Sequence, residues 1–324
     1  MGTTSVETGQ RALRLPAAGT ALALVLLAAG CTSGAGQAAG AFPEVVIAMP
    51  AWTGGQANAA VAAHVLREEL GVPVQLRELS PDQAWDQMDA GAVQAVLEDW
   101  GATPDKRRLY TAQRMSVVPA GDLGPVGRVG WYVPSGYAAA NPGVLDWRNL
   151  NDHADAFASA DSDGRGRLLT GGPDDASHDE ALIDALDLAY TAVPTGGEEQ
   201  LIEALRGADR GDGAVLANWW QPHWLHEELE LAEVALPEHR AGCHREGGSD
   251  MCGYPDIPLR KFLNAAFAEH GGEAAAFLTD FSWTAEEQNE VARMIAAEGM
   301  SPEGAAARWA EKNGERIAGW LGED

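Results

Sequence analysis

The sequence predicts an α/β fold in two halves around a cleft, with a C-terminal third made of helices. Short apolar runs have the length of buried strands, and amphipathic segments separate the first three of these runs. The resulting β-α-β-α-β order implies parallel strands joined by helical crossovers. A chain of 324 residues also exceeds what one compact core usually carries, which favours two lobes.

The first half is predicted to alternate between strands and helices. A Gly-containing turn follows the first strand, and the amphipathic period after it indicates a helix. The third strand ends in acidic and aromatic residues. The expected elements are strands 44–49, 72–79 and 92–100, the turn 52–55, and helices 56–70 and 82–90.

The second half is predicted to repeat this alternation, and the chain then returns to the first. We expect lobe 1 at residues 42–130 plus 232–324 and lobe 2 at 131–231. The expected elements of the second half are strands 127–133, 167–172 and 214–220, helices 178–188 and 198–206, and a loop with short helices at 134–164. The C-terminal helices are expected at 257–269, 273–281, 285–298 and 302–319.

The N-terminus predicts export and a lipid anchor. Arg11 and Arg14 precede the apolar stretch 15–29, which is short for a membrane span and ends in small residues. The sequence LLAAGC at 26–31 resembles a bacterial lipobox, so we expect a signal peptide at 1–30, lipidation of Cys31 and a tether at 31–41. The mature chain would then lie on the extracytoplasmic face of the cell membrane. An ordinary signal peptide with an incidental cysteine is the alternative.

The net charge of −26 argues against nucleic acid as a partner and against a basic face for anionic lipids. We therefore expect contact with the membrane through the anchor only. A strongly acidic chain is compatible with cationic or zwitterionic ligands. The acidic surface of an exported protein also explains most of this charge.

Two cysteines remain beside Cys31, and an oxidising compartment favours a disulfide between them. Cys243 and Cys252 would close a small loop. A metal site that also uses His239 and His244 is the alternative, although the spacing matches no standard zinc pattern. We expect no metal and no cofactor.

Tryptophan marks the candidate ligand site. The chain has 11 Trp against 5 Tyr, and the sequence NWWQPHW at 218–224 follows an apolar run. Ligands of open α/β sheets lie at strand ends and helix N-termini, and indole is the best aromatic face for a quaternary ammonium. The residues at such places are Trp52, Asp99, Trp100, the turn 171–177 and Trp220.

No catalytic motif is recognisable in the sequence. It has no Gly-x-Ser-x-Gly elbow, no P-loop, no His-Glu-x-x-His and no dinucleotide fingerprint after a strand. We predict that the chain is not an enzyme. Two alternatives stay open: a lipid-anchored hydrolase of choline-type esters, and a tethered receptor with the same fold.

Several motifs together resemble a known family over residues 45–321. They are AWTGG (51–55), LEDWG (97–101), GWYVP (130–134), NWWQPHW (218–224), CGYP (252–255), FSWT (281–284) and GMSPE (299–303). In this order they are similar to the substrate-binding proteins of ABC importers for glycine betaine, proline betaine and choline-like compounds. The resemblance implies a type II periplasmic-binding-protein fold with two lobes that close on the ligand, and a permease and its ATPase subunit as partners.

The resemblance also implies an aromatic cage around the ammonium group. By position, Trp100 and Trp220 match cage residues, and Trp52 is a third expected wall. Because neighbouring strand residues face opposite ways, we expect Trp220 rather than Trp219 to line the cage, and at most one of Trp131 and Tyr132 to face inward. Tyr132 is included among the candidate ligand residues.

The turn at 171–177 departs from the family pattern, because many relatives carry an aromatic residue there and this chain does not. Asp174, Asp175 and Ser177 stand in its place, and Asp99 precedes Trp100. Acids beside a cation cage favour a ligand without its own carboxylate, such as choline. Helix N-termini could instead bind a carboxylate. Glycine betaine, choline, carnitine and other trimethylammonium compounds all remain candidates, in osmoprotection or in nutrient uptake.

Overall fold

The computed structural model describes residues 2, 42–171, 178–240, 243 and 252–322. The chain divides into two units, Met1–Ala38 and Ala39–Asp324, and all helices and strands described here belong to the second. The predicted signal peptide, Cys31 and the tether lie outside the described residues, apart from residue 2. Within the described part, no helix is long and apolar enough to cross a bilayer.

Within the described residues, nine strands form the sheet, in the order β2-β1-β3-β9-β4-β7-β5-β6, with β8 paired to β4. The neighbours β2, β1 and β3 are parallel, as are β6, β5 and β7, whereas β9 and β4 run antiparallel to their neighbours. The strands are β1 (Val45–Met49), β2 (Val74–Glu78), β3 (Ala95–Asp99), β4 (Val117–Pro134), β5 (Gly166–Thr170), β6 (Tyr190–Pro194), β7 (Leu216–Gln221), β8 (Leu231–Glu233) and β9 (Ile257–Asn264). This is the mixed α/β architecture that the sequence predicted.

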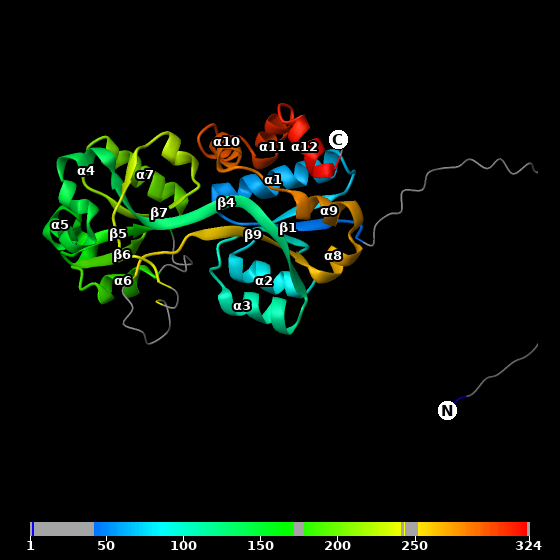
Figure 1. The fold of residues 1–324 in the computed structure, drawn as a ribbon, viewed down its shortest axis with the longest axis horizontal. Coiled ribbons are helices and arrows are strands. Elements are labelled where there is room, and N and C mark those ends of the chain that lie inside the picture. Colours follow the sequence, from blue (N-terminus) through cyan, green and yellow to red (C-terminus); the bar gives the residue numbers. More distant parts are fainter. Residues whose placement is uncertain (1, 3–41, 172–177, 241–242, 244–251, 323–324) are drawn as a thin grey trace, which may run out of the picture. The chain divides into compact units, whose positions relative to one another are not determined.

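The long strand β4 belongs to two regions of the sheet. Its first part, from Val117 to Gly127, pairs with β9, and the following residues Arg128–Tyr132 pair with β7 (Figure 1). We call the strands β2, β1, β3 and β9 with the first part of β4 the first region, and β7, β5, β6 and β8 with the rest of β4 the second region. The lobe boundary predicted between residues 130 and 131 falls inside this strand, and the lobe limits remain a prediction.

Helices cover both regions. Helix α1 buries eleven of its 16 residues, five of them alanines, and these small side chains let it pack closely on α10 and α11. The helices are α1 (Thr53–Glu68), α2 (Pro81–Asp89), α3 (Pro104–Arg108), α4 (Ser135–Ala140), α5 (Leu150–Phe157), α6 (Asp179–Ala185), α7 (Glu198–Asp209), α8 (Ala265–His270), α9 (Gly272–Asp280), α10 (Ala285–Ala296), α11 (Pro302–Ala310) and α12 (Gly314–Leu321). A π-helical turn, Leu109–Gln113, follows α3, and 3-10 turns lie at Pro142–Leu145, Trp147–Asn149, Ala160–Ser162 and Trp224–Glu227.

The helix predicted at 257–269 is wrong. Residues Ile257–Asn264 form β9, and only Ala265–His270 are helical. Leu259, Phe262 and Leu263 have the spacing of a helix face, but β9 lies between β3 and β4 with both faces covered, so apolar side chains are buried on both. The C-terminal third is therefore not all helical.

Smaller differences between the prediction and the structure concern elements whose sequence patterns are weak. The strands β6 and β8, helix α3 and the first part of β4 were not predicted, and the helix predicted at 302–319 is divided into α11 and α12. The first part of β4 contains three glycines and two prolines, which indicate turns rather than a strand when read alone. Pairing with β9 makes it a strand.

A buried lysine joins β9 to the helices that follow it. Lys261 is fully buried, and its Nζ donates to the carbonyl oxygens of Leu278 at 3.1 Å and Thr279 at 2.6 Å, and also to that of Phe281. These carbonyls lie at and just after the C-terminal end of α9, where a positive charge is favourable. Burial lowers the pKa of Lys261 to about 8.

Candidate ligand-binding site

Two of the predicted cage indoles meet at one carboxylate. The Nε1 of Trp52 donates to Glu98 Oε1 at 2.7 Å, and the Nε1 of Trp100 donates to the same oxygen at 2.5 Å. The other oxygen, Oε2, accepts from Gln288 Nε2 at 2.9 Å and from Asn58 Nδ2. Both indoles keep part of their surface exposed, whereas Glu98 is buried. Glu98 thus holds both indole rings through their N–H groups.

Glu98 lies at the end of β3, two residues before Trp100. Side chains alternate along a strand, so Glu98 and Trp100 share a face, and Asp99 points to the other one. The sequence-based prediction singled out Asp99 and missed Glu98. The signal that could have found it was the alternation itself, applied to LEDW.

Asp99 makes a different contact. Its Oδ2 accepts from Arg107 Nη1 at 3.2 Å, and its side chain is only 5% exposed. Burial raises the pKa of Asp99, while the nearby Arg107 guanidinium lowers it. The structure therefore pairs Asp99 with a cation of the protein and places Glu98 with the indoles.

The carboxylate of Glu98 is held by four N–H donors. Burial raises its pKa above the ordinary value, and the hydrogen bonds from Trp100, Trp52, Gln288 and Asn58 act in the opposite direction. All four contacts are made by N–H groups, which donate to the two oxygens of the carboxylate.

Two glycines make room for these indoles. A Cβ at Gly55 would lie 2.8 Å from Trp52 Nε1 and 2.2 Å from Pro50. A Cβ at Gly127 in β4 would lie 2.5 Å from a carbon of the Trp100 ring. Glycine at both positions lets the rings lie against backbone.

Trp220 belongs to a separate aromatic group at the end of β7. Its ring centroid lies 5.1 Å from that of His223 and 4.6 Å from that of Trp219. The alternation of side chains along a strand predicted that the two indoles would point apart. This prediction is wrong. Strand β7 ends at Gln221, and the two large rings fold toward each other at the end of the strand. Trp219 is nonetheless fully buried, whereas Trp220 is partly exposed.

A bridge of three residues connects the two regions beside these indoles. Glu198, the first residue of α7, accepts from the backbone N of Thr53 at 2.9 Å, from Thr53 Oγ1 at 2.5 Å and from His223 Nε2 at 3.1 Å. Because His223 Nδ1 accepts from Leu225 N at 3.0 Å, its Nε2 carries the proton. We call Thr53, Glu198 and His223 the inter-region bridge. The bridge links Thr53, which follows Trp52, with His223, whose ring packs against that of Trp220.

The bridge also caps a helix. Thr53 is the first residue of α1, which has no side-chain cap of its own, and Glu198 places a carboxylate at this positive helix end. Burial alone would raise the pKa of Glu198, but hydrogen bonds from His223 and Thr53 hold it below its ordinary value.

A second buried carboxylate lies in the second region. Asp179 Oδ1 accepts from Trp131 Nε1 at 2.7 Å and from the Tyr254 hydroxyl, and Oδ2 accepts from Asn218 Nδ2 at 2.8 Å. The neighbouring Tyr132 is 1% exposed, and its ring packs edge-on against His226. Trp131 and Tyr132 are therefore both buried.

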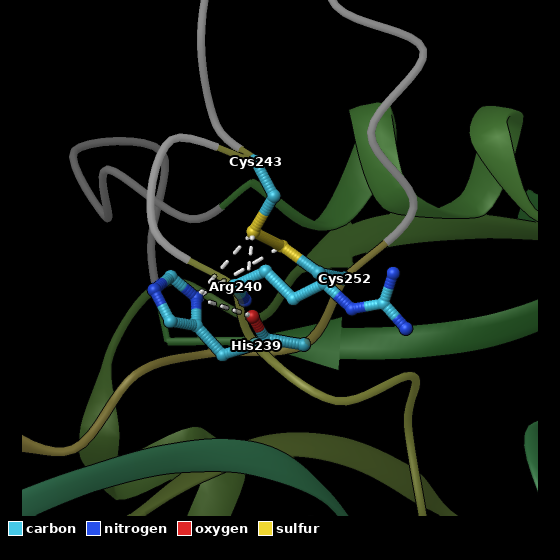
Figure 2. The surroundings of a disulfide bond; sticks show 5 residues. His239, Arg240, Cys243 and Cys252 are labelled. Carbon is cyan, nitrogen blue, oxygen red and sulfur yellow. Dashed lines mark hydrogen bonds between the residues drawn. A yellow bond between two sulfur atoms is a disulfide. The ribbon is translucent and has the colours of Figure 1, made fainter.

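The remaining predicted ligand residues, Asp174, Asp175 and Ser177, lie outside the described residues, as does the lipidation candidate Cys31. The disulfide predicted between Cys243 and Cys252 is present (Figure 2). His239 Nδ1 lies 3.6 Å from Cys243 Sγ and 3.9 Å from Cys252 Sγ. These three residues have the proximity of metal ligands, but the two sulfurs are bonded to each other and are not thiolates.

Comparison with known proteins identifies the family. Residues 43–312 match the family described as the substrate-binding domain of the ABC-type glycine betaine transport system. The chain belongs to this family. The resemblance inferred from the motifs is thereby confirmed, and so is the prediction of a binding protein rather than an enzyme.

Individual relatives show the same relationship. The trimethylamine N-oxide-binding protein of Pelagibacter ubique (strain HTCC1062) is 28% identical over 298 residues, covering 87% of this chain and 91% of the relative. The glycine betaine/carnitine transport binding protein GbuC of Listeria monocytogenes serotype 1/2a (strain 10403S) is 23% identical over 128 residues, 40% of this chain and 38% of GbuC.

Solved structures show the same fold. The structure of lactococcal OpuAC, closed and complexed with glycine betaine, matches with a TM-score of 0.68 and 19% identity, covering 86% of this chain and 100% of OpuAC. An ABC-transporter choline-binding protein in complex with choline matches with a TM-score of 0.69 and 18% identity, covering 86% of this chain and 92% of that protein. The predicted binding-protein fold is confirmed.

Proposed function

We propose that this chain is the lipid-anchored solute-binding component of an ABC importer and that it captures a small trimethylammonium compound for a membrane permease. The observation that carries the proposal is the pair of indoles, Trp52 and Trp100, held by the buried carboxylate of Glu98. Trp220 supplies the third wall from the other region. Each desolvated cation–π contact contributes about 2 kcal/mol at best.

The geometry supports this use of the three indoles. Trp52, Trp100 and Trp220 are partly exposed, while the other indoles of the same core, such as Trp219 and Trp224, are buried. The inter-region bridge connects the Trp52 side to the Trp220 side. Tyr132, which is buried, supports the second region in this proposal and does not contact the ligand.

The ligand is one of four related compounds: glycine betaine, choline, carnitine or trimethylamine N-oxide. The first three follow from the motifs, and the fourth from the similarity to the Pelagibacter protein over most of both chains. All share the trimethylammonium group, which the indoles would bind. Asp174, Asp175 and Ser177 are proposed to contact the opposite end of the ligand, where these compounds differ.

Isothermal titration of the mature protein with the four compounds tests the proposal. We expect micromolar binding of at least one, and loss of this binding in the double variant Trp100→Ala plus Trp220→Ala, with Trp85→Phe in the core as a control for tryptophan content. Trp85 is buried against Phe262. Absence of heat with all four compounds would contradict the proposed ligand class.

The anchor is proposed at Cys31, with the binding unit on the extracytoplasmic face of the membrane and the permease and its ATPase as partners. The support is the sequence LLAAGC after an apolar stretch, together with the family's role in ABC import. We expect Cys31→Ser to abolish membrane association of the expressed protein. Membrane retention of this variant would contradict the anchor.

A further inference from the structure

We propose that Glu198 decides which trimethylammonium compounds the site accepts. Its own carboxylate takes the hydrogen-bond donors that a ligand carboxylate would need, and this excludes ligands that carry one. The inference rests on the proposed function and narrows it. Choline and trimethylamine N-oxide lack a carboxylate and remain candidates, whereas glycine betaine and carnitine carry one and are excluded.

The donors around Glu198 have the arrangement of an anion-binding site. Thr53 begins α1, a helix of 16 residues, and its backbone N donates to Glu198 Oε2 at 2.9 Å. Thr53 Oγ1, at 2.5 Å, and His223 Nε2, at 3.1 Å, both donate to Oε1. The N-terminus of a helix carries partial positive charge and binds carboxylates readily. Both oxygens of Glu198 therefore have the partners that the carboxylate of a ligand would take.

These donors adjoin two of the proposed walls of the ligand site. Thr53 directly follows Trp52, and the ring centroid of His223 lies 5.1 Å from that of Trp220. In glycine betaine a single methylene group separates the ammonium nitrogen from the carboxylate. An ammonium group held by the indoles would bring this carboxylate toward Thr53 and His223, where Glu198 already stands.

Glu198 also comes from the edge of the sheet at which the polar end of the ligand is expected. It begins α7, which follows β6, and β6 pairs in parallel with β5. Beyond the end of β6, the N of Thr195 donates to the carbonyl oxygen of Thr170, the last residue of β5, at 2.9 Å. The turn 171–177 follows directly. Glu198 and this turn thus start from neighbouring strand ends, the place where ligands of α/β sheets lie.

The carboxylate of Glu198 is charged at neutral pH. Burial raises the pKa of this group, but the hydrogen bonds from His223 and Thr53 hold it below its ordinary value of 4.5. The side chain is only 11% exposed, so solvent screens its charge weakly. A ligand carboxylate would have to displace Glu198 from its three donors or lie beside a like charge. Both are unfavourable, and the second is a general means of rejecting a wrong ligand.

Compounds without a carboxylate meet neither obstacle. The hydroxyl group of choline can donate to an oxygen of Glu198, because a carboxylate oxygen accepts more than one hydrogen bond. In trimethylamine N-oxide the oxygen is bonded directly to the nitrogen. This compound therefore extends less far toward Thr53 and His223 than glycine betaine does.

Isothermal titration of the mature wild-type protein and of Glu198→Ala with the four compounds tests the inference. We expect the wild type to bind choline or trimethylamine N-oxide at least about 10-fold more tightly than glycine betaine and carnitine, the effect of one hydrogen bond to a charged group. In Glu198→Ala the ratio should shift about 10-fold toward the carboxylates, with glycine betaine bound more tightly than by the wild type. A purely structural role of Glu198 predicts the opposite, a loss of affinity for every ligand.

Glu199→Ala, the next residue of α7 and exposed, is the matched control and should leave the ratio unchanged. If Glu198→Ala does not fold, Glu198→Gln removes the charge but keeps the volume and one acceptor oxygen, and its ratio should shift in the same direction. A wild type that binds glycine betaine or carnitine as tightly as the other two compounds would overturn the inference, as would an unchanged ratio in the Glu198 variant. Absence of binding of all four compounds would instead overturn the proposed function itself.

Acetate gives a second test, which does not depend on the binding of a trimethylammonium compound. In Glu198→Ala a free carboxylate can occupy the donors of Thr53 and His223 that the side chain has left. At constant ionic strength, we expect acetate in place of chloride to raise the melting temperature of Glu198→Ala but not that of the wild type or Glu199→Ala. An equal response of the three proteins would show that these donors do not form an anion site, and the inference would fail.

Discussion

The ring of Trp100 depends on the absence of a side chain at Gly127. The ring lies so close to the β4 backbone that a methyl group at this position would overlap two of its carbons, at 2.5 and 2.9 Å. Since Trp100 is partly exposed, its ring has room to move outward. Such a movement would pull its Nε1 away from Glu98.

We therefore expect Gly127→Ala to weaken binding of the trimethylammonium ligand about 10-fold, because overpacking of roughly 1–3 kcal/mol is relieved by displacing the ring. Titration with the ligand that binds the wild-type protein measures this. Gly319→Ala in α12 is the control, since a Cβ there meets nothing within 4 Å. A Gly127→Ala variant that binds like the wild type would show that the ring position does not matter.

The residues of the site were predictable to different degrees. The indoles at 52, 100 and 220 follow from the rule that ligands lie at strand ends, which needs no tertiary structure. The alternation of side chains in β3 was enough to predict that Glu98 lies on the same face as Trp100. Asp99 was selected instead because it directly precedes Trp100. Glu198 was out of reach, because a contact between residues 53 and 198 depends on how two distant helices meet.

Among the secondary-structure elements, β9 shows where sequence patterns are ambiguous. A strand covered on both faces has apolar residues at adjacent positions, and these also occur at helical spacing. Lys261 does not indicate a buried strand when the sequence is read alone, because a lysine in a strand is normally exposed. Its burial becomes understandable only when the carbonyls of α9 and the following residues are placed around it.

Lys261→Met is expected to destabilise the protein by about 2 kcal/mol, because it leaves buried carbonyl groups near the end of α9 without a donor. Urea unfolding measures the free energy of unfolding. Arg260→Met serves as the control on the same strand, since Arg260 is largely exposed and pairs with Asp122 at the surface. Equal stabilities of the two variants would mean that the carbonyls find other partners.

On the scale of the whole molecule, the inter-region bridge connects α1 with α7 through one carboxylate. Glu198→Gln should lower the thermal stability at neutral pH by the equivalent of about 2 kcal/mol, since hydrogen bonds to a charged group contribute roughly 1.5–3 kcal/mol. Glu199→Gln, one residue further on α7 and exposed, is the matched control. It should have little effect.

The effect of Glu198→Gln should depend on pH. The pKa of Glu198 lies below its ordinary value of 4.5, so the folded protein binds this proton less readily than the unfolded chain does. The stabilisation is therefore fully present above pH 4.5 and is lost as the pH falls through the lowered pKa. Melting temperatures of the wild type and variant should converge as the pH falls below 4.5, and a constant difference would contradict the bridge.

The course of β4 has a consequence for how the molecule unfolds. One strand of 18 residues pairs with β9 in one region and with β7 in the other. Loss of β4 from either region removes a central strand and exposes the apolar faces on both of its sides. The two regions therefore cannot melt one after the other as separate folding units. A chain that resembles two domains in its sequence should behave in a calorimeter as one cooperative unit.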